Sequence, residues 1–269
     1  MDDWYWALIM LHSQKFDITA TASEGGEIDP AGVTKVQYSK NITYTLTPNA
    51  GYAIKAVFVD GKDVGAVSEY TFKNVTKKHT IHALFEQINP YTDVKAGDWF
   101  YDDVLYVTAI GLMEGTGNGK FSPEITTDRA MLVTVLWRLE GCPVVDSSVD
   151  FDDVADGLWY SDAIDWASAN GIVNGYGDGK FGPTDQITRE QIAAILNRYA
   201  AYKGWTDGIA LPMLAQYKCS EWAEDNVIWA ENNGLLDGLG VDVSDMTAKA
   251  SRAELAAYLA KFYKEFAEN

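Results

Sequence analysis

The feature that most constrains the fold is a threefold internal repeat that fills the last two thirds of the chain. A shift of 60 positions superimposes a tryptophan, a glycine, a Gly-Lys-Phe segment and an arginine, and a further shift of 63 superimposes the tryptophan, glycine and arginine again. Repeated units of this kind pack against their own copies, because none can bury its apolar face alone. The repeated residues are Trp99, Trp159 and Trp222; Gly111, Gly171 and Gly234; Gly119 and Gly179; and Arg129, Arg189 and Arg252.

Each unit has the pattern of two helices joined by a loop. The first helix follows an aromatic residue and ends at a glycine, which favours the left-handed conformation after a helix. The second helix carries one apolar stripe at i, i+3, i+4 and i+7, as in Ile192, Ile195, Leu196 and Tyr199. Three such stripes predict a helical bundle with pseudo-threefold symmetry.

Residues 16–88 have the period of strands instead. In the segment from His79 to Phe85, alternation places Ile81, Ala83 and Phe85 on one face. The dipeptide Asp60-Gly61 is a strong hairpin signal. We therefore predict an α+β multidomain protein, with a small β-rich N-terminal domain before the bundle. The expected segments are 1–15, a leader or remnant of an upstream segment or else an added strand; 16–88, the β domain; and units 89–145, 146–208 and 209–269.

The charge of the chain excludes several classes of partner. A formal net charge of -18 opposes binding to nucleic acid and to a polyanionic membrane surface. Its simplest explanation is solubility. The N-terminus is acidic where a secretory signal would be basic, and the apolar run from Trp4 to Leu11 is too short to span a membrane.

We expect neither a metal nor a cofactor. Cys142 and Cys219 lie in no paired short spacing, although a single bridge between them is an open alternative. His79 and His82 are three residues apart in a strand, so they point to opposite faces. The Gly/Asp-rich loop has neither the alternating acidic ligands of a calcium loop nor the Gly-Lys-Ser/Thr of a Walker loop.

The functional argument concerns the start of the second helix of each unit. Asp128, Thr188 and Ser251 are favourable N-cap residues, and an arginine follows each of them. A cation at a helix N-terminus loses roughly 0.3–1 kcal/mol against the helix dipole. We therefore expect an anion beside Arg129, Arg189 and Arg252, held by the guanidinium and by free backbone N–H groups. The alternative is an ion pair with an Asp or Glu of a neighbouring unit.

Two family resemblances follow from these motifs. Residues 16–88 resemble the divergent internalin-type B-repeat, a β spacer or adhesive module of bacterial surface proteins. This resemblance rests on Gly25-Gly26-Glu27-Ile28, Thr45 to Tyr52, Val59-Asp60-Gly61 and Tyr70-Thr71-Phe72. The repeats resemble the S-layer homology domain, on the motif from Phe151 through Trp159 and Gly171–Pro183 to Ile187-Thr188-Arg189.

The second resemblance implies a function. S-layer homology domains occur in threes and hold a pyruvylated amino sugar of the secondary cell-wall polysaccharide, with the arginine facing the acidic ketal. The implied protein is extracellular and associated with the cell wall or S-layer, and its β domain could have a protein partner. The implied ligand-binding residues are Arg129, Arg189 and Arg252, with Trp99, Trp159, Trp222, Gly119 and Gly179 as groove walls; on their own, the tryptophans would be assigned to the core.

The chain also departs from that family pattern. The first two units lack the family's glutamate three residues after the cap, and the third lacks the opening Phe-x-Asp and the Gly-Asp-Gly-Lys-Phe loop. We therefore expect the groove that depends on the third loop to be the weakest or empty. Two other functions stay open from the sequence: structural assembly into a surface lattice without glycan, and, more remotely, an enzyme such as a glycosidase. The recurring carboxylates Asp102, Asp162 and Asp225 are expected instead in first turns of helices.

Overall fold

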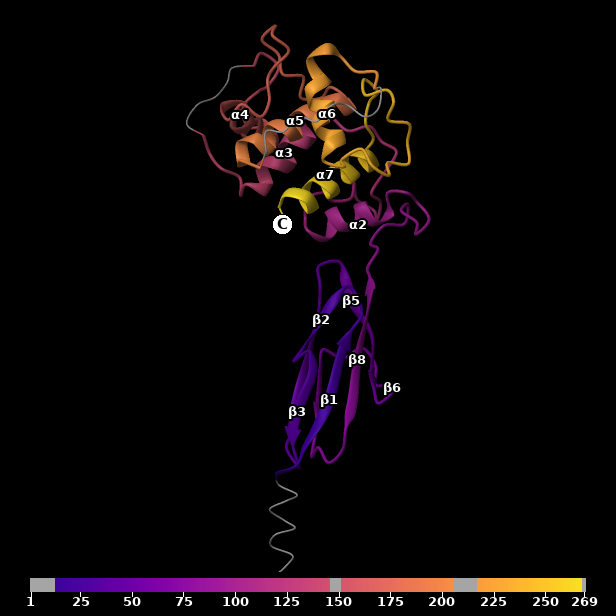
Figure 1. Cartoon of the computed structure of the whole chain (residues 1–269). Helices are drawn as coiled ribbons and strands as arrows, with labels where there is room; N and C mark the ends of the chain where they lie inside the picture. The colour runs from indigo at the N-terminus through magenta and orange to yellow at the C-terminus, as the bar shows by residue number, and fades with distance from the viewer. Residues whose placement is uncertain (1–12, 146–150, 206–216, 268–269) are drawn as a thin grey trace, which may run out of the picture. The chain divides into compact units, whose positions relative to one another are not determined.

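The structure is a computed structural model that describes residues 13–145, 151–205 and 217–267. The chain divides into two compact units between Asn89 and Pro90. The prediction of an α+β chain is confirmed, because the described residues form eight strands followed by six α-helices (Figure 1). Most of the expected segment 1–15, the junction after residue 145 and the junction at 208 and 209 lie outside the described residues.

The N-terminal unit is built from two β-sheets. One sheet has five strands in the order β3-β1-β8-β5-β6, in which β1 is antiparallel to β3 and parallel to β8, and the other has the order β2-β4-β7. The strands are β1 (Lys15–Ala22), β2 (Gly26–Asp29), β3 (Gly32–Gln37), β4 (Ile42–Pro48), β5 (Tyr52–Val59), β6 (Lys62–Asp63), β7 (Glu69–Phe72) and β8 (His79–Gln87).

The two sheets share one apolar core. Ile18 and Val57 of the larger sheet belong to the same buried cluster as Tyr44 and Phe72 of the smaller one, so the sheets are packed face to face. In β8, Ile81, Ala83 and Phe85 are buried, as the period-two alternation predicts. The predicted hairpin is also confirmed, since Asp60 and Gly61 join β5 to β6 with φ values of 50° and 78°.

The C-terminal unit contains three helix pairs. Each pair has a shorter first helix and a second helix that starts at the repeated arginine. The helices are α2 (Tyr101–Ala109), α3 (Arg129–Leu139), α4 (Ser161–Ala169), α5 (Arg189–Lys203), α6 (Glu224–Asn232) and α7 (Arg252–Phe266), and a short 3-10 helix, η1 (Glu221–Ala223), precedes α6.

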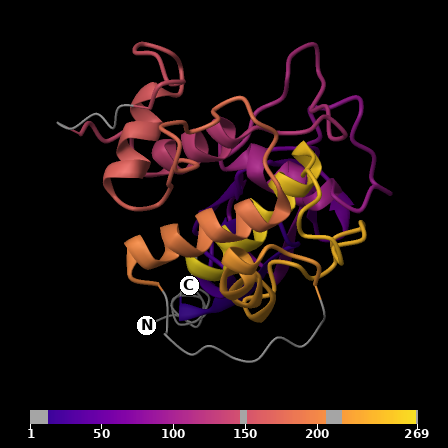
Figure 2. The same ribbon diagram turned by 90° about the horizontal axis from the view of Figure 1, so that it is seen from above.

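The three units are interlocked in a ring. The first helix of each unit packs against the second helix of the preceding unit, α4 on α3 and α6 on α5, and α2 of the first unit packs on α7 of the third. Helices α5 and α7 also lie side by side, in orange and yellow in Figure 2. Leu132, Ile192 and Leu255, at the same position of the repeated stripe, are fully buried in one common core.

The helix ends follow the sequence signals. Gly111, Gly171 and Gly234 have positive φ just after α2, α4 and α6. Thr188 and Ser251 each form a complete capping box. Asp102, Asp162 and Asp225 lie in first turns, as expected.

Three sequence-based questions concern sites and spans. Cys142 and Cys219 are both free, so the bridge that the sequence left open is not formed. The described part of the chain contains no group of three or more metal-binding side chains. Among the described helices, none combines the length and apolarity needed to cross a membrane.

Candidate functional site

A pocket of about 350 Å³ is lined mostly by residues of the second helical unit. One residue of the first unit and one of the third complete its lining. Four of its lining residues belong to α5, and four belong to the loop after α4. Among the described residues that line it, two are cationic and none is acidic. The lining residues are Arg129, Val173, Asn174, Gly175, Tyr176, Gln191, Ala194, Ile195, Arg198 and Trp222.

The repeat pattern explains why these residues meet. Gln191, Ala194, Ile195 and Arg198 share one face of α5 because they follow the spacing i, i+3, i+4 and i+7. Gly175 lets the loop approach its neighbours closely, because a Cβ there would lie 2.6 Å from the carbonyl oxygen of Lys180. The pocket is thus formed by the packing of the loop after α4 against one face of α5.

Arg129 enters the pocket from the start of α3. Its Nε donates to the carbonyl oxygen of Phe181 at 3.0 Å, and its Nη2 donates to that of Asn174 at 3.1 Å. Its guanidinium carbon also lies 4.8 Å from the ring centroid of Tyr176. Arg129 is only 5% exposed, and these acceptors belong to the loop of the second unit.

Arg198 supplies the second cation. It is half-buried, and it makes no hydrogen bond or ion pair with the described residues. Burial lowers the pKa of Arg198. Burial also lowers the pKa of Arg129, against the opposing effects of Tyr176 and of the carboxylates of Asp185 and Asp153, and the nearby charge of Arg198 lowers it further. Two guanidiniums that repel each other at a pocket with no carboxylate among its described lining residues favour an anionic ligand.

The three repeated arginines connect the units in a cycle. Arg252 repeats the geometry of Arg129, because its Nε donates to the carbonyl of Phe121 at 2.9 Å and its Nη2 to that of Glu114 at 2.7 Å. Arg189 donates from Nη1 to the carbonyls of Asp242 and Asp245 at 2.7 and 3.1 Å. Each arginine therefore binds the loop of the next unit, and the third binds the loop of the first.

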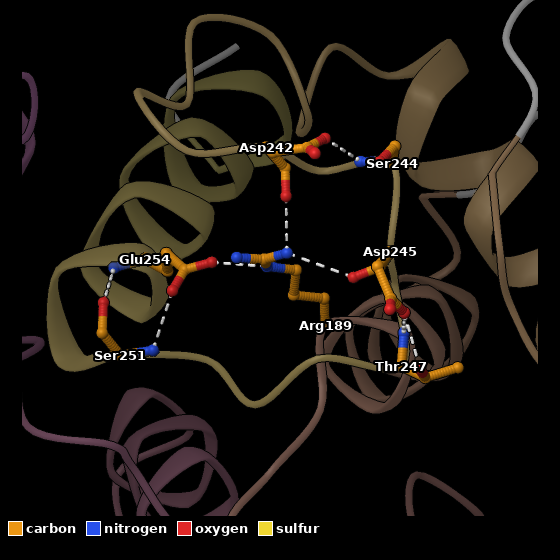
Figure 3. A network of polar contacts seen from close by, with 7 residues as sticks. All are labelled: Arg189, Asp242, Ser244, Asp245, Thr247, Ser251 and Glu254. Carbon is orange, nitrogen blue, oxygen red and sulfur yellow. Dashed lines mark hydrogen bonds and ion pairs between the residues drawn. The ribbon is translucent and has the colours of Figure 1, made fainter.

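Arg189 differs in having a carboxylate partner. Its Nε lies 2.5 Å from Oε1 of Glu254, and the other carboxylate oxygen of Glu254 accepts from the backbone N–H of Ser251 at 2.9 Å. Figure 3 shows the guanidinium enclosed by Glu254, Asp242 and Asp245. The ion pair to a neighbouring unit, which the sequence offers as an alternative, is therefore formed at Arg189.

These contacts correct the electrostatic reasoning from the sequence. The cation at each helix start is compensated by loop carbonyl oxygens of the protein itself, which sequence spacing could not place. All three arginines are buried, with exposures of 5%, 8% and 6% for Arg129, Arg189 and Arg252. Of the three, Arg129 is the one that lines the pocket.

The other predicted wall residues lie in different environments. Trp159 and Trp222 are 57% and 53% exposed, so their assignment to the core is wrong, and Trp222 lines the pocket. Trp99 is partly buried and packs against Gly240 of the third unit. Gly119 and Gly179, with φ values of 66° and 86°, form tight turns within their loops and do not line this pocket.

Two aspartates hold the loops in shape. Asp153 accepts hydrogen bonds from the backbone N–H groups of Phe181 and Gly182, each at 2.8 Å. Burial raises the pKa of this carboxyl, but the backbone hydrogen bonds together outweigh it and leave the pKa lowered. Asp93 does the same for Phe121 and Ser122 in the first unit.

Sequence reasoning missed part of the lining. Arg198, Tyr176 and Gly175 were not predicted as site residues, although Arg198 has a cationic counterpart in each unit, Arg138 and Lys261. That recurrence was the available signal. It was hidden because the position lies well inside a helix, where a cation is ordinary.

Comparison with known proteins gives one family match, which lies in the helical part, and several relatives. The S-layer homology domain family matches residues 90–130 and 150–193. An amylopullulanase of Thermoanaerobacterium thermosulfurigenes is 31% identical over 75% of this chain, and an S-layer protein of Bacillus licheniformis is 27% identical over 66%. The exoglucanase XynX of Acetivibrio thermocellus is 30% identical over 63%.

These relatives are much longer proteins. The chain covers 11% of the amylopullulanase, 16% of the exoglucanase and 20% of the S-layer protein. The similarity therefore concerns a segment that enzymes and S-layer proteins have in common.

Proposed function

Because the chain contains S-layer homology domains and is related to S-layer proteins of the bacterial cell surface, we propose that its helical unit anchors a surface protein to the cell wall by binding an acidic, pyruvylated wall polysaccharide. The observation that carries this proposal is the pocket with two guanidiniums, Arg129 and Arg198, and no carboxylate among the described residues that line it. The third unit is proposed to be a divergent third repeat.

The pocket has the chemistry that an acidic sugar requires. A guanidinium can bind a carboxylate with two parallel hydrogen bonds, and Arg198 has no protein partner to lose among the described residues. Trp222 offers an exposed aromatic surface for the apolar face of a sugar ring. Tyr176, which also lines the pocket, donates a hydrogen bond from its hydroxyl to Asp185 at 3.0 Å.

Arg129 has a second role in this proposal. Its bonds to Phe181 and Asn174 fix the loop that bears Gly175 and Tyr176. It therefore positions the loop while it contributes positive charge to the pocket.

The β unit is proposed to act as a spacer or adhesive module. This rests on its resemblance to B-repeats and on its two packed sheets. Its partner would be a protein at the cell surface.

The test is binding to purified wall sacculi, with and without chemical removal of the pyruvyl groups. Replacing Arg198→Gln should weaken binding about 10- to 150-fold, the equivalent of losing one charge-assisted hydrogen bond of roughly 1.5–3 kcal/mol. Trp222→Ala should weaken it as well. The matched control is Lys180→Gln. It removes one positive charge from an exposed side chain in the loop between α4 and α5, and Lys180 does not line the pocket.

Two results would contradict the proposal. One is equal binding to sacculi with and without pyruvyl groups. The other is equal loss of binding in Arg198→Gln and Lys180→Gln, which would indicate a general charge effect. Assembly into a lattice without glycan is the competing function, and concentration-dependent sedimentation of the purified chain with no wall binding would favour it.

A further inference from the structure

We propose that the third unit's counterpart of this pocket is closed by the protein's own side chains, so that the acidic sugar binds at Arg129 and Arg198 but not at Arg189. This inference rests on the proposed function and specifies where it operates. Four observations carry it: three positions differ in sequence between the two grooves, and at the fourth the same residue, a tryptophan, differs in its packing.

The first difference is an internal carboxylate. The shift of 63 that superimposes Arg189 on Arg252 also superimposes Gln191, in the pocket lining, on Glu254. Glu254 is 4% exposed and pairs with Arg189. Glutamate is also the residue of the family pattern at this position, so the pair closes the groove only together with the three differences that follow. A ligand carboxylate would have to displace Glu254 against like-charge repulsion.

The second difference is volume. The same shift superimposes Ile195, which lines the pocket, on Tyr258. Tyr258 is fully buried, and its hydroxyl has no hydrogen-bond partner in the structure as described. The larger side chain occupies space that the smaller one leaves open in the second unit.

The third difference concerns the second cation. Arg198 corresponds to Lys261, which lies 3.3 Å from a carboxylate oxygen of Asp103 on the helix packed against α7. The counterpart of Asp103 beside Arg198 is the neutral Asn226, because both are the third residue of their helices. Lys261 therefore has a carboxylate partner, whereas Arg198 makes no hydrogen bond or ion pair with the described residues.

The fourth difference is the position of the tryptophan. Trp222 stays 53% exposed at the pocket. Its equivalent, Trp99, packs so closely on Gly240 that a Cβ there would lie 2.3 Å from the indole. The aromatic surface available to a sugar in the second unit is thus folded onto the protein in the third.

The experiment converts one groove into the other in the full chain. The variant Asp103→Asn, Glu254→Gln, Tyr258→Ile removes the two carboxylates and the bulky side chain from the third groove, and leaves Lys261 and the packing of Trp99 on Gly240 as they are. The glutamine introduced by Glu254→Gln should keep the capping box, as Gln191 does in the wild type. The reciprocal variant Gln191→Glu, Ile195→Tyr, Asn226→Asp closes the second pocket.

Binding at each groove is followed separately by ¹⁹F NMR of protein labelled with 5-fluorotryptophan. The probe is a synthetic pyruvylated amino-sugar monosaccharide, and the Trp99 and Trp222 resonances are assigned with Trp99→Phe and Trp222→Phe. In the wild type, Trp222 should shift on titration and Trp99 should not. In the opened variant both should shift, with dissociation constants within about tenfold of each other, and in the closed variant the Trp222 shift should vanish.

Each other outcome has a defined meaning. If Trp99 responds in the wild type at the same concentration as Trp222, or if the closed variant still shifts Trp222, the inference is overturned. It is also overturned if the opened variant, and the same variant with Gly240→Ala to displace Trp99, keep their native circular dichroism spectra but Trp99 responds in neither. A silent Trp222 in the wild type would overturn the proposed function instead, and this inference with it.

Discussion

The substitution Arg129→Ala distinguishes the structural account from the electrostatic one. If the arginine were only a misplaced cation at a helix start, its removal would leave the fold intact or stabilise it by roughly 0.3–1 kcal/mol. The structure leads to the opposite sign, because Arg129 is 5% exposed and donates to two carbonyl oxygens of another unit.

The magnitude follows from these contacts. Each hydrogen bond from a charged donor contributes roughly 1.5–3 kcal/mol, and the contact with the rings of Tyr176 and Phe181 adds about 0.5–2 kcal/mol. Because neighbouring contributions are not additive and the carbonyls can partly rehydrate, we expect a net loss of about 2–3 kcal/mol. With a urea dependence of about 2 kcal/mol per molar, the midpoint should fall by about 1 M.

Tryptophan fluorescence during urea unfolding measures this loss. Strands β1 to β8 contain no tryptophan, so the signal of the described residues comes from the helical unit. The control is Arg198→Ala, which removes an equal charge but no hydrogen bond among the described residues, and should change the midpoint little while weakening glycan binding. An Arg129→Ala variant as stable as the wild type, or more stable, would refute the reasoning.

Two further predictions concern the loops. Because the pKa values of Asp93 and Asp153 are lowered in the folded protein, both carboxylates stabilise the fold above their unfolded pKa of about 3.9, and this stabilisation is lost as pH falls through their folded pKa. Asp153→Asn should therefore lower the melting temperature at pH 7 and have a smaller effect toward pH 2. A decrease in melting temperature that does not depend on pH would contradict this reasoning. Gly175→Ala should lower stability and glycan affinity, because its Cβ would meet Lys180 and Phe151 at 2.6 Å, whereas Gly97→Ala, with nothing within 4 Å, should leave thermal melting and sacculus binding unchanged.

The sequence predicted most of the fold because the signals were local and repeated. The stripe containing Ile192 and the left-handed glycines each follow from spacing within one unit. The partner of each helix could not be predicted in this way, because α2 packs on α7 across the whole repeat region. Long-range pairing is determined by tertiary contacts that a pattern within one unit does not contain.

For the candidate site, the sequence predicted the residue type but not its role. The unfavourable position of Arg129 predicted an anion beside it, but its hydrogen-bond acceptors are the neutral carbonyl oxygens of Phe181 and Asn174, which have no sequence signature. The repeated tryptophans do not share one environment. Trp222 is exposed at the pocket, whereas Trp99 is packed against Gly240. Such differences depend on neighbours that come from another unit.

The cycle of arginine contacts has a consequence for how such a unit can change in length. Arg129, Arg189 and Arg252 each reach forward to the following loop, and the last reaches round to the beginning. A cycle of three has no terminal member, so neither deletion of one copy nor insertion of a fourth preserves every link. Gene rearrangements that keep this architecture working are therefore expected to add or remove copies in complete sets of three.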